Sequence, residues 1–320
     1  MSRTQYAASL PSPQTFKTSP TNTRHLKIIK ELVDDNVLIT SVAWSPVHRH
    51  VAIGTDDNQV ILWDAKNKEV LRKYRSNSDR VSSISWQSSF CFSSAGRDAT
   101  IFHHDVRIPP QWETASTLVP CGHQEEICGL KWSPDGTLLA SGSSDHLVSI
   151  WDPRRPEEPL YKFLKHKSAV RALAWCPWIR NLLASGGGTE DSTVRFWEIT
   201  TGSELKVIET GAQVTSILWL ETSEQLITSH GYRTGADGYL HNVKDNIRLW
   251  DYPSMHQVGV LLGHDKRVLH TALSPDGTTL ISLSSDETLV IWKRTGNKFP
   301  IQRKERHNCS PFDPNKVYIR

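Results

Sequence analysis

Histidine and aspartate recur along this 320-residue chain in a pattern that could carry proton transfer. A carboxylate can orient an imidazole, which then acts as a general base. In three segments a serine and a tryptophan accompany the pair. The three sets are His123–Ser141–Asp145–Trp151, His166–Ser185–Asp191–Trp197 and His264–Ser282–Asp286–Trp292. Because the same set recurs from segment to segment, we interpret it as a structural hydrogen-bonded network that fixes the conformation of each segment. We assign no catalytic residue.

Metal binding is the second chemistry to consider. The adjacent residues His103, His104 and Asp105 could ligate a metal ion, but no further ligand follows at a metal-like spacing. His104 also occupies the place that tryptophan takes in the other segments. The five cysteines contain no CxxC pair, which argues against a zinc site or a disulfide framework and favours a reducing compartment. We therefore expect no metal, no cofactor and no enzymatic activity.

Bulk composition narrows the class further. Hydrophobic residues make up 38% of the chain and charged residues 22%, as in a soluble globular protein. The net charge of +3 is too small to indicate nucleic-acid binding. The chain has no apolar run of about 18 residues and no secretory leader pattern, so we expect neither a membrane segment nor secretion. The nucleus and the cytoplasm are the expected locations.

Six segments of the chain end alike. They are DNQVILWD at Trp63, DATIFHHD at His104, DHLVSIWD at Trp151, DSTVRFWE at Trp197, DNIRLWD at Trp250 and DETLVIWK at Trp292. The ends lie 41 to 53 residues apart, which is the period of a four-stranded propeller blade. In five segments an aspartate precedes the final aromatic position by six residues. In the fifth segment along the chain, Asp245 precedes Trp250 by five.

Alternating apolar stretches and turn signals between these segments predict short strands. The sequence SPDGT occurs at 133–137 and 274–278, where Pro presets φ and Gly accepts a positive φ. The prediction is an all-β WD-repeat β-propeller with six recognisable blades, plus a partial or missing first blade of a seven-bladed ring, and a six-bladed ring is the alternative. We expect a disordered, low-complexity segment with one outer strand over 1–35, the propeller over 36–295, and a flexible tail over 296–320.

Several stretches together resemble the Fizzy and Fizzy-related coactivators of the anaphase-promoting complex, a cell-cycle ubiquitin ligase. They include FHHDVR, EEICGLKWSPDGTLLASGSSD, AVRALAWCPW, NLLASGGGT, GHDKRVLHTALSPDG and the terminal Ile-Arg. The resemblance covers roughly residues 36–320. It implies a seven-bladed propeller that recognises degrons on substrates, such as cyclins, and delivers them to the ligase. The implied function is that of a substrate-recognition coactivator.

The resemblance also implies site residues. The family binds a Lys-Glu-Asn degron on the top face near the propeller axis. The positions that match this site are Ser144, His146, Thr189, Gln213 and Arg267. Arg267 would pair with the glutamate of the degron. The family usually has asparagine where this chain has Ser144 and His146, which puts the affinity for that degron in doubt.

Two further sites follow from the resemblance. Glu287 matches an acidic residue of the destruction-box groove, which lies between the first and the last blade of the family. Ile319 and Arg320 match the tail that docks in a helical-repeat subunit of the ligase, where Arg donates hydrogen bonds and Ile is buried. The leading strands of the family's first blade and its N-terminal ligase-binding box have no match in this sequence.

These differences leave several hypotheses open. The chain could be a fragment or an incomplete gene model of a coactivator, a divergent coactivator of the meiosis-specific kind, or a shortened form that competes with full coactivators. The insertion over 231–246 favours divergence. A WD-repeat scaffold without a ligase role is the alternative from a different class, because propellers support many functions.

Overall fold

The computed structural model describes residues 37–47, 49–108, 116–119, 122–243, 246–294, 299 and 307–308. They form six four-stranded antiparallel sheets, one two-stranded hairpin and a short 3-10 helix, η2 (Glu221–Ser223). We number the four-stranded sheets blade 1 to blade 6 in chain order. The all-β, WD-repeat propeller architecture with six blades is thus confirmed. No helix of the described part is long and apolar enough to cross a membrane.

The first three blades contain twelve strands. Blade 1 consists of β1 (Ile39–Trp44), β2 (His50–Thr55), β3 (Val60–Asp64) and β4 (Glu69–Tyr74). Blade 2 consists of β5 (Val81–Trp86), β6 (Cys91–Gly96), β7 (Ile101–Asp105) and β8 (Ser116–Val119). Blade 3 consists of β9 (Ile127–Trp132), β10 (Leu139–Ser143), β11 (Val148–Trp151) and β12 (Tyr161–Phe163).

The last three blades follow the same order, with one insertion. Blade 4 consists of β13 (Ala172–Trp175), β14 (Leu182–Gly186), β15 (Thr193–Glu198) and β16 (Ser203–Glu209). Blade 5 consists of β17 (Val214–Leu220), β18 (Gln225–His230), β21 (Ile247–Asp251) and β22 (Gln257–Leu261). The hairpin of β19 (Tyr232–Thr234) and β20 (Leu240–Asn242) lies between β18 and β21. Blade 6 consists of β23 (Val268–Leu273), β24 (Thr279–Ser284), β25 (Thr288–Lys293) and β26 (His307–Asn308).

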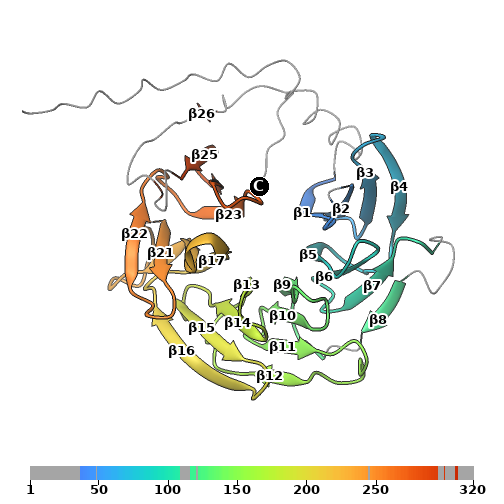
Figure 1. Ribbon diagram of the computed structural model, residues 1–320, viewed down its shortest axis with the longest axis horizontal. Helices are drawn as coiled ribbons and strands as arrows, with labels where there is room; N and C mark the ends of the chain where they lie inside the picture. The colour runs from blue at the N-terminus through green and yellow to red at the C-terminus, as the bar shows by residue number, and fades with distance from the viewer. Residues whose placement is uncertain are drawn as a thin grey trace, which may run out of the picture.

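The blades follow one another around a central axis, and the first strand of each blade lies nearest to it (Figure 1). These innermost strands are β1, β5, β9, β13, β17 and β23. Blade 1 and blade 6 flank an interval of the ring that no described strand occupies (Figure 1). The expected outer strand before residue 36 lies outside the described residues. β26 pairs with β25, so the last blade draws two residues from the segment expected to be a tail.

The middle strands are largely buried, and in the internal blades a neighbouring blade covers each face. Every residue of β3, β10 and β14 is buried. The outer strand β16 instead alternates between exposed and half-buried residues over most of its length. The blades approach so closely that a Cβ added at Gly142 would lie 2.5 Å from the carbonyl oxygen of Val170 in the next blade. Glycine is needed there because any side chain would collide with that backbone.

Tryptophans at the ends of innermost strands join blades 2, 4 and 5 to the blade before them. The indole Nε1 of Trp86 donates to the carbonyl oxygen of Ala43 at 3.0 Å, and that of Trp175 donates to Lys131 at 2.9 Å. Trp219 makes the same contact with Ala174 at 3.1 Å. Each ring is buried, so the bond satisfies a donor that would otherwise be unpaired. The repeated bond helps to set the position of these three blades relative to their predecessors.

Candidate binding face

The strand order brings two groups of connections to one end of the ring. The first and second strands of a blade are antiparallel. The innermost strand therefore starts at the same end of the ring as the one where the second strand finishes. The turn between second and third strands and the segment leading into the innermost strand therefore lie together. We call this end the top face. It contains all five residues expected to bind a degron, together with Glu287.

Ser144 and His146 lie in the turn between β10 and β11. The backbone N–H of Ser144 donates to the carbonyl oxygen of Glu126 at 2.9 Å, and its hydroxyl lies 3.2 Å from the Cys128 sulfur. His146 is exposed and has a φ of 71°. Residues such as asparagine tolerate that left-handed conformation better than most, so the turn geometry suits the residue that the family usually has there.

Gln213 and Arg267 are connected through a residue that sequence analysis did not single out, Tyr232 on β19. The N–H of Gln213 donates to the carbonyl oxygen of Tyr232 at 2.8 Å. The Arg267 guanidinium lies over the Tyr232 ring, 5.1 Å from its centroid, in a cation–π arrangement. The signal for Tyr232 was its place at the start of the insertion, but only the fold shows that it supports Arg267.

Arg267 leaves hydrogen-bonding capacity unused. Its Nε is buried and has no hydrogen-bond partner among the described residues. A buried donor without a partner costs free energy, so this group is prepared to bind an acceptor that a ligand brings.

Thr189 lies in the loop between β14 and β15, where its carbonyl oxygen accepts from the Ser192 hydroxyl at 2.8 Å. The next residue, Glu190, accepts from Thr234 of the inserted hairpin at 3.1 Å.

A second charged group at this face also escaped sequence analysis. Arg80 and Glu126 precede the innermost strands β5 and β9, and two N–H···O bonds of 2.8 and 2.6 Å join them. Glu287 lies in the turn between β24 and β25, is exposed, and has a φ of 64°. Ile319 and Arg320, the expected docking residues, lie outside the described residues.

The repeated polar sets lie inside the blades. In blade 3, His123 Nε2 lies 2.8 Å from the Ser141 hydroxyl, which accepts from Trp151 Nε1 at 2.9 Å, while His123 Nδ1 lies 3.0 Å from Asp145. Burial lowers the pKa of His123, and Asp145 partly offsets this effect. The imidazole is therefore mostly neutral at pH 7. Every polar atom of the set serves the blade, which leaves none to act on a substrate.

The corresponding sets in blades 4 and 6 differ in one contact. In blade 4, His166 bonds to both Asp191 and Ser185, and the Ser185 hydroxyl accepts from Trp197 at 2.7 Å. In blade 6, His264 Nε2 lies 2.7 Å from Ser282, which accepts from Trp292 at 2.9 Å. His264 Nδ1 bonds to the Thr288 hydroxyl at 2.9 Å, whereas Asp286 lies 3.6 Å away. Thr288 in turn donates to Asp286 and thus adds one residue to the hydrogen-bonded network of blade 6.

Blade 2 contains the same network built from other residue types. Asn77 takes the place of the histidine and donates to Asp98 at 3.2 Å, and His104 takes the place of the tryptophan. Both are joined to the Ser94 hydroxyl at 2.8 Å. Burial lowers the pKa of His104 to about 3 and that of His103 to about 4. Among the described residues, no group of three or more histidine, cysteine or carboxylate side chains could hold a metal ion.

Comparisons with known proteins agree with this architecture. A family model, the CDC20/Fizzy WD40 domain, matches residues 15–292. The chain is 39% identical to the anaphase-promoting complex subunit cdc20 of Dictyostelium discoideum over 96% of this chain and 59% of that protein. It is 41% identical to cell division cycle 20.1, cofactor of APC complex, of Arabidopsis thaliana over 81% of this chain and 54% of that protein.

A solved structure resembles the fold as well. A chain in the crystal structure of the mitotic checkpoint complex superposes with a TM-score of 0.75 at 36% identity, covering 82% of this chain and 77% of that one. WD repeat-containing protein srw1 of Schizosaccharomyces pombe is 38% identical over 86% of this chain and 46% of its own length. The chain thus spans about half the length of the curated relatives that it matches.

Proposed function

Because the chain belongs to the CDC20/Fizzy WD40 family, we propose that it acts as a substrate-recognition coactivator of the anaphase-promoting complex. The names of these relatives describe them as a subunit or a cofactor of that complex. In this proposal, degron peptides bind at the top face. The terminal residues Ile319 and Arg320 dock to a helical-repeat subunit of the ligase.

The observation that carries the proposal is the position of the Arg267 guanidinium and its unpaired buried donor. Its guanidinium is held over Tyr232, and its Nε is buried without a hydrogen-bond partner among the described residues. Gln213 is held by backbone bonds on both sides, through Tyr232 and Gly231. A pre-positioned guanidinium beside a neutral amide suits a short peptide that offers a carboxylate and an amide, as Lys-Glu-Asn does.

Binding of a Lys-Glu-Asn peptide to the purified protein tests the degron site. We expect Arg267→Ala to weaken the peptide's affinity at least tenfold, because it removes the partner of the glutamate. Arg154→Ala is the matched control, since Arg154 is an exposed arginine in a turn at the opposite end of blade 3. Equal affinities for the wild type and Arg267→Ala, measured by fluorescence anisotropy, would exclude this site.

The two departures from the family pattern supply a gain-of-function test. The double variant Ser144→Asn, His146→Asn restores the residues that the family usually has. Asparagine offers both a donor and an acceptor and tolerates the left-handed φ of position 146. We expect the peptide to bind several-fold more tightly to the double variant, and unchanged or weaker binding would argue that the peptide sits elsewhere.

Co-purification with the ligase tests the docking tail. We expect the wild-type chain to be retained by immobilised anaphase-promoting complex and a chain that lacks Ile319 and Arg320 to be lost. Replacement of both residues by alanine controls for chain length, and thermal melting shows whether the propeller stays folded. Equal retention of all three chains would favour a WD-repeat scaffold without this role of the tail.

A further inference from the structure

The innermost strands share an irregularity that turns side chains toward the axis. In blades 1, 2, 3, 5 and 6 the pairing of the first two strands skips one residue. Such β-bulges redirect a side chain and recur near functional sites. The skipped residues are Thr40, Ser82, Cys128, Thr215 and Leu269. In blade 4, Arg171 immediately precedes β13 and takes the same place.

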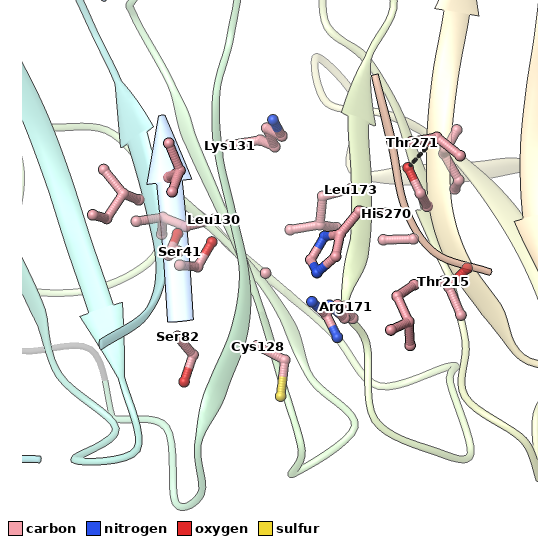
Figure 2. A pocket seen from close by; sticks show the side chains of 18 of the residues that line it. Ser41, Ser82, Cys128, Leu130, Lys131, Arg171, Leu173, Thr215, His270 and Thr271 are labelled. Atoms are coloured by element: carbon pink, nitrogen blue, oxygen red, sulfur yellow. Dashed lines mark hydrogen bonds between the residues drawn. The ribbon is translucent and has the colours of Figure 1, made fainter. Parts of the chain in front are cut away.

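These residues line a cavity on the axis of the ring, which we call the channel. Its volume is about 270 Å³, and its walls come from all six innermost strands. Two side chains with fixed positive charge, Lys131 and Arg171, line it together with the imidazole of His270 (Figure 2). The lining residues include no aspartate or glutamate. The charge of the channel wall is therefore positive.

Neither cation is directly paired with a carboxylate of the described residues, although the charge of Glu126 reaches Arg171. Neither Lys131 nor Arg171 forms an ion pair or a side-chain hydrogen bond with a described residue. The carboxylate of Glu126 acts on Arg171 from the top face, but it already accepts two bonds from Arg80. Water reaches both cationic side chains within the channel, yet desolvation by the surrounding strands lowers the pKa of each.

Neutral donors complete the lining. The hydroxyl of Ser41 lines the channel and makes no hydrogen bond with a described residue (Figure 2). Burial, followed by the charge of Arg171, lowers the pKa of His270 to about 4, so the ring is neutral at pH 7 and can still donate one N–H. Partly desolvated positive charges are unfavourable unless an anion compensates them.

We propose that the channel binds a small, multiply charged oxyanion of the phosphate class, with Arg171 and Lys131 as its charged contacts. Arginine and lysine both bind phosphate oxygens, arginine through its planar fork and lysine as a point charge. The channel volume of about 270 Å³ has room for pyrophosphate, whose two phosphoryl groups can face Arg171 and Lys131 separately. The site lies along the axis and does not depend on a bound peptide.

Calorimetric titration with inorganic pyrophosphate, at constant ionic strength and without peptide, tests this proposal. We expect one pyrophosphate to bind per chain and the dissociation constant to rise at least tenfold in Arg171→Gln and in Lys131→Met. Arg154→Gln, in which an exposed arginine outside the channel is changed, should bind like the wild type. Sodium chloride at the same ionic strength should not compete.

A second measurement shows that the variants are folded. Without pyrophosphate, Arg171→Gln should melt at the same temperature as the wild type or higher, because it removes an uncompensated charge. Pyrophosphate should then raise the melting temperature of the wild type alone. Absence of binding to the wild type, equal binding to Arg171→Gln, or a loss of binding only in Arg267→Ala would overturn the proposal, since the last result would place the anion on the top face.

Discussion

Blade 4 and blade 1 have the same strand order but hold their tryptophans differently. Trp197 in blade 4 is buried, stacks on Phe163 at 4.1 Å between ring centroids, and donates to Ser185. Trp63 at the same place in blade 1 is also buried, but Ile53 stands where the serine would be. The Nε1 of Trp63 therefore has no hydrogen-bond partner among the described residues.

The innermost strands show the same contrast. Trp175 in blade 4 is 7% exposed because it packs against blade 3, whereas Trp44 in blade 1 is 53% exposed. In blade 6, Ile291 is 42% exposed, while the matching Phe196 of blade 4 is buried. An internal blade is covered on both faces, and the blades that flank the interval have fewer described neighbours. The same sequence pattern therefore has a different energetic value at different places in the ring.

The largest difference is expected between two tryptophan truncations. Trp175→Ala should lower the free energy of unfolding by about 3–5 kcal/mol, because it removes a large buried side chain. Trp44→Ala should change it by less than about 1 kcal/mol, since half of that ring is in water. Urea denaturation followed by circular dichroism measures both values. Equal losses would mean that Trp44 is also covered.

Acid should destabilise blade 2 more than blade 4, because blade 2 has the titratable His104 where blade 4 has Trp197. Burial lowers the pKa of His104 to about 3, against 6.5 for an exposed histidine. The contribution of neutral His104 to the free energy of unfolding is complete above pH 6.5. It is lost as the pH falls toward 3, because the unfolded chain binds the proton first. At pH 5 the loss is about 2 kcal/mol.

Urea denaturation at pH 7 and pH 5 measures this effect. His104→Gln cannot take up the proton, so it should lose about 2 kcal/mol less than the wild type between the two pH values. Because Gln also changes packing beside Phe92, only the difference between pH values is compared. The same pH dependence in both proteins would assign the acid sensitivity to other groups.

Removal of the central hydroxyl of a network should cost less than the Trp175→Ala truncation. Ser185→Ala leaves Trp197 Nε1 and His166 Nε2 without their shared partner, which costs about 1–3 kcal/mol. Ser144→Ala is a suitable control, because its half-buried hydroxyl contacts only the Cys128 sulfur among the described residues. A loss below 0.5 kcal/mol on chemical denaturation would show that water replaces the missing hydroxyl.

The smallest effect concerns blade 1. Thr228 of blade 5 accepts from Trp250 at 2.8 Å, so threonine at the matching position 53 should accept from Trp63. Burying threonine in place of valine normally costs free energy. We expect Ile53→Thr to be at least as stable as Ile53→Val, with a free energy of unfolding higher by up to about 1 kcal/mol. If the valine variant is clearly more stable, the Trp63 donor already has a partner.

The sequence by itself determined the number of blades and the polar sets within blades 3, 4 and 6. Both depend on local features, namely alternating strands, Pro-Asp-Gly turns and a spacing that repeats. Blades 3, 4 and 6 have to satisfy the same buried polar groups, so the residue types of His166, Ser185, Asp191 and Trp197 recur there at fixed positions. Repetition makes such residues visible without a structure.

Only the tertiary structure decided the rest. The network of blade 2 replaces two residue types at once, so no spacing rule connects Asn77 with His104. Tyr232 meets Arg267 because a hairpin inserted in blade 5 reaches the entry to blade 6. Lys131 and Arg171 share a channel because the ring arrangement places the innermost strands of separate blades around one axis. Contacts between distant segments depend on three-dimensional closure, which no local pattern encodes.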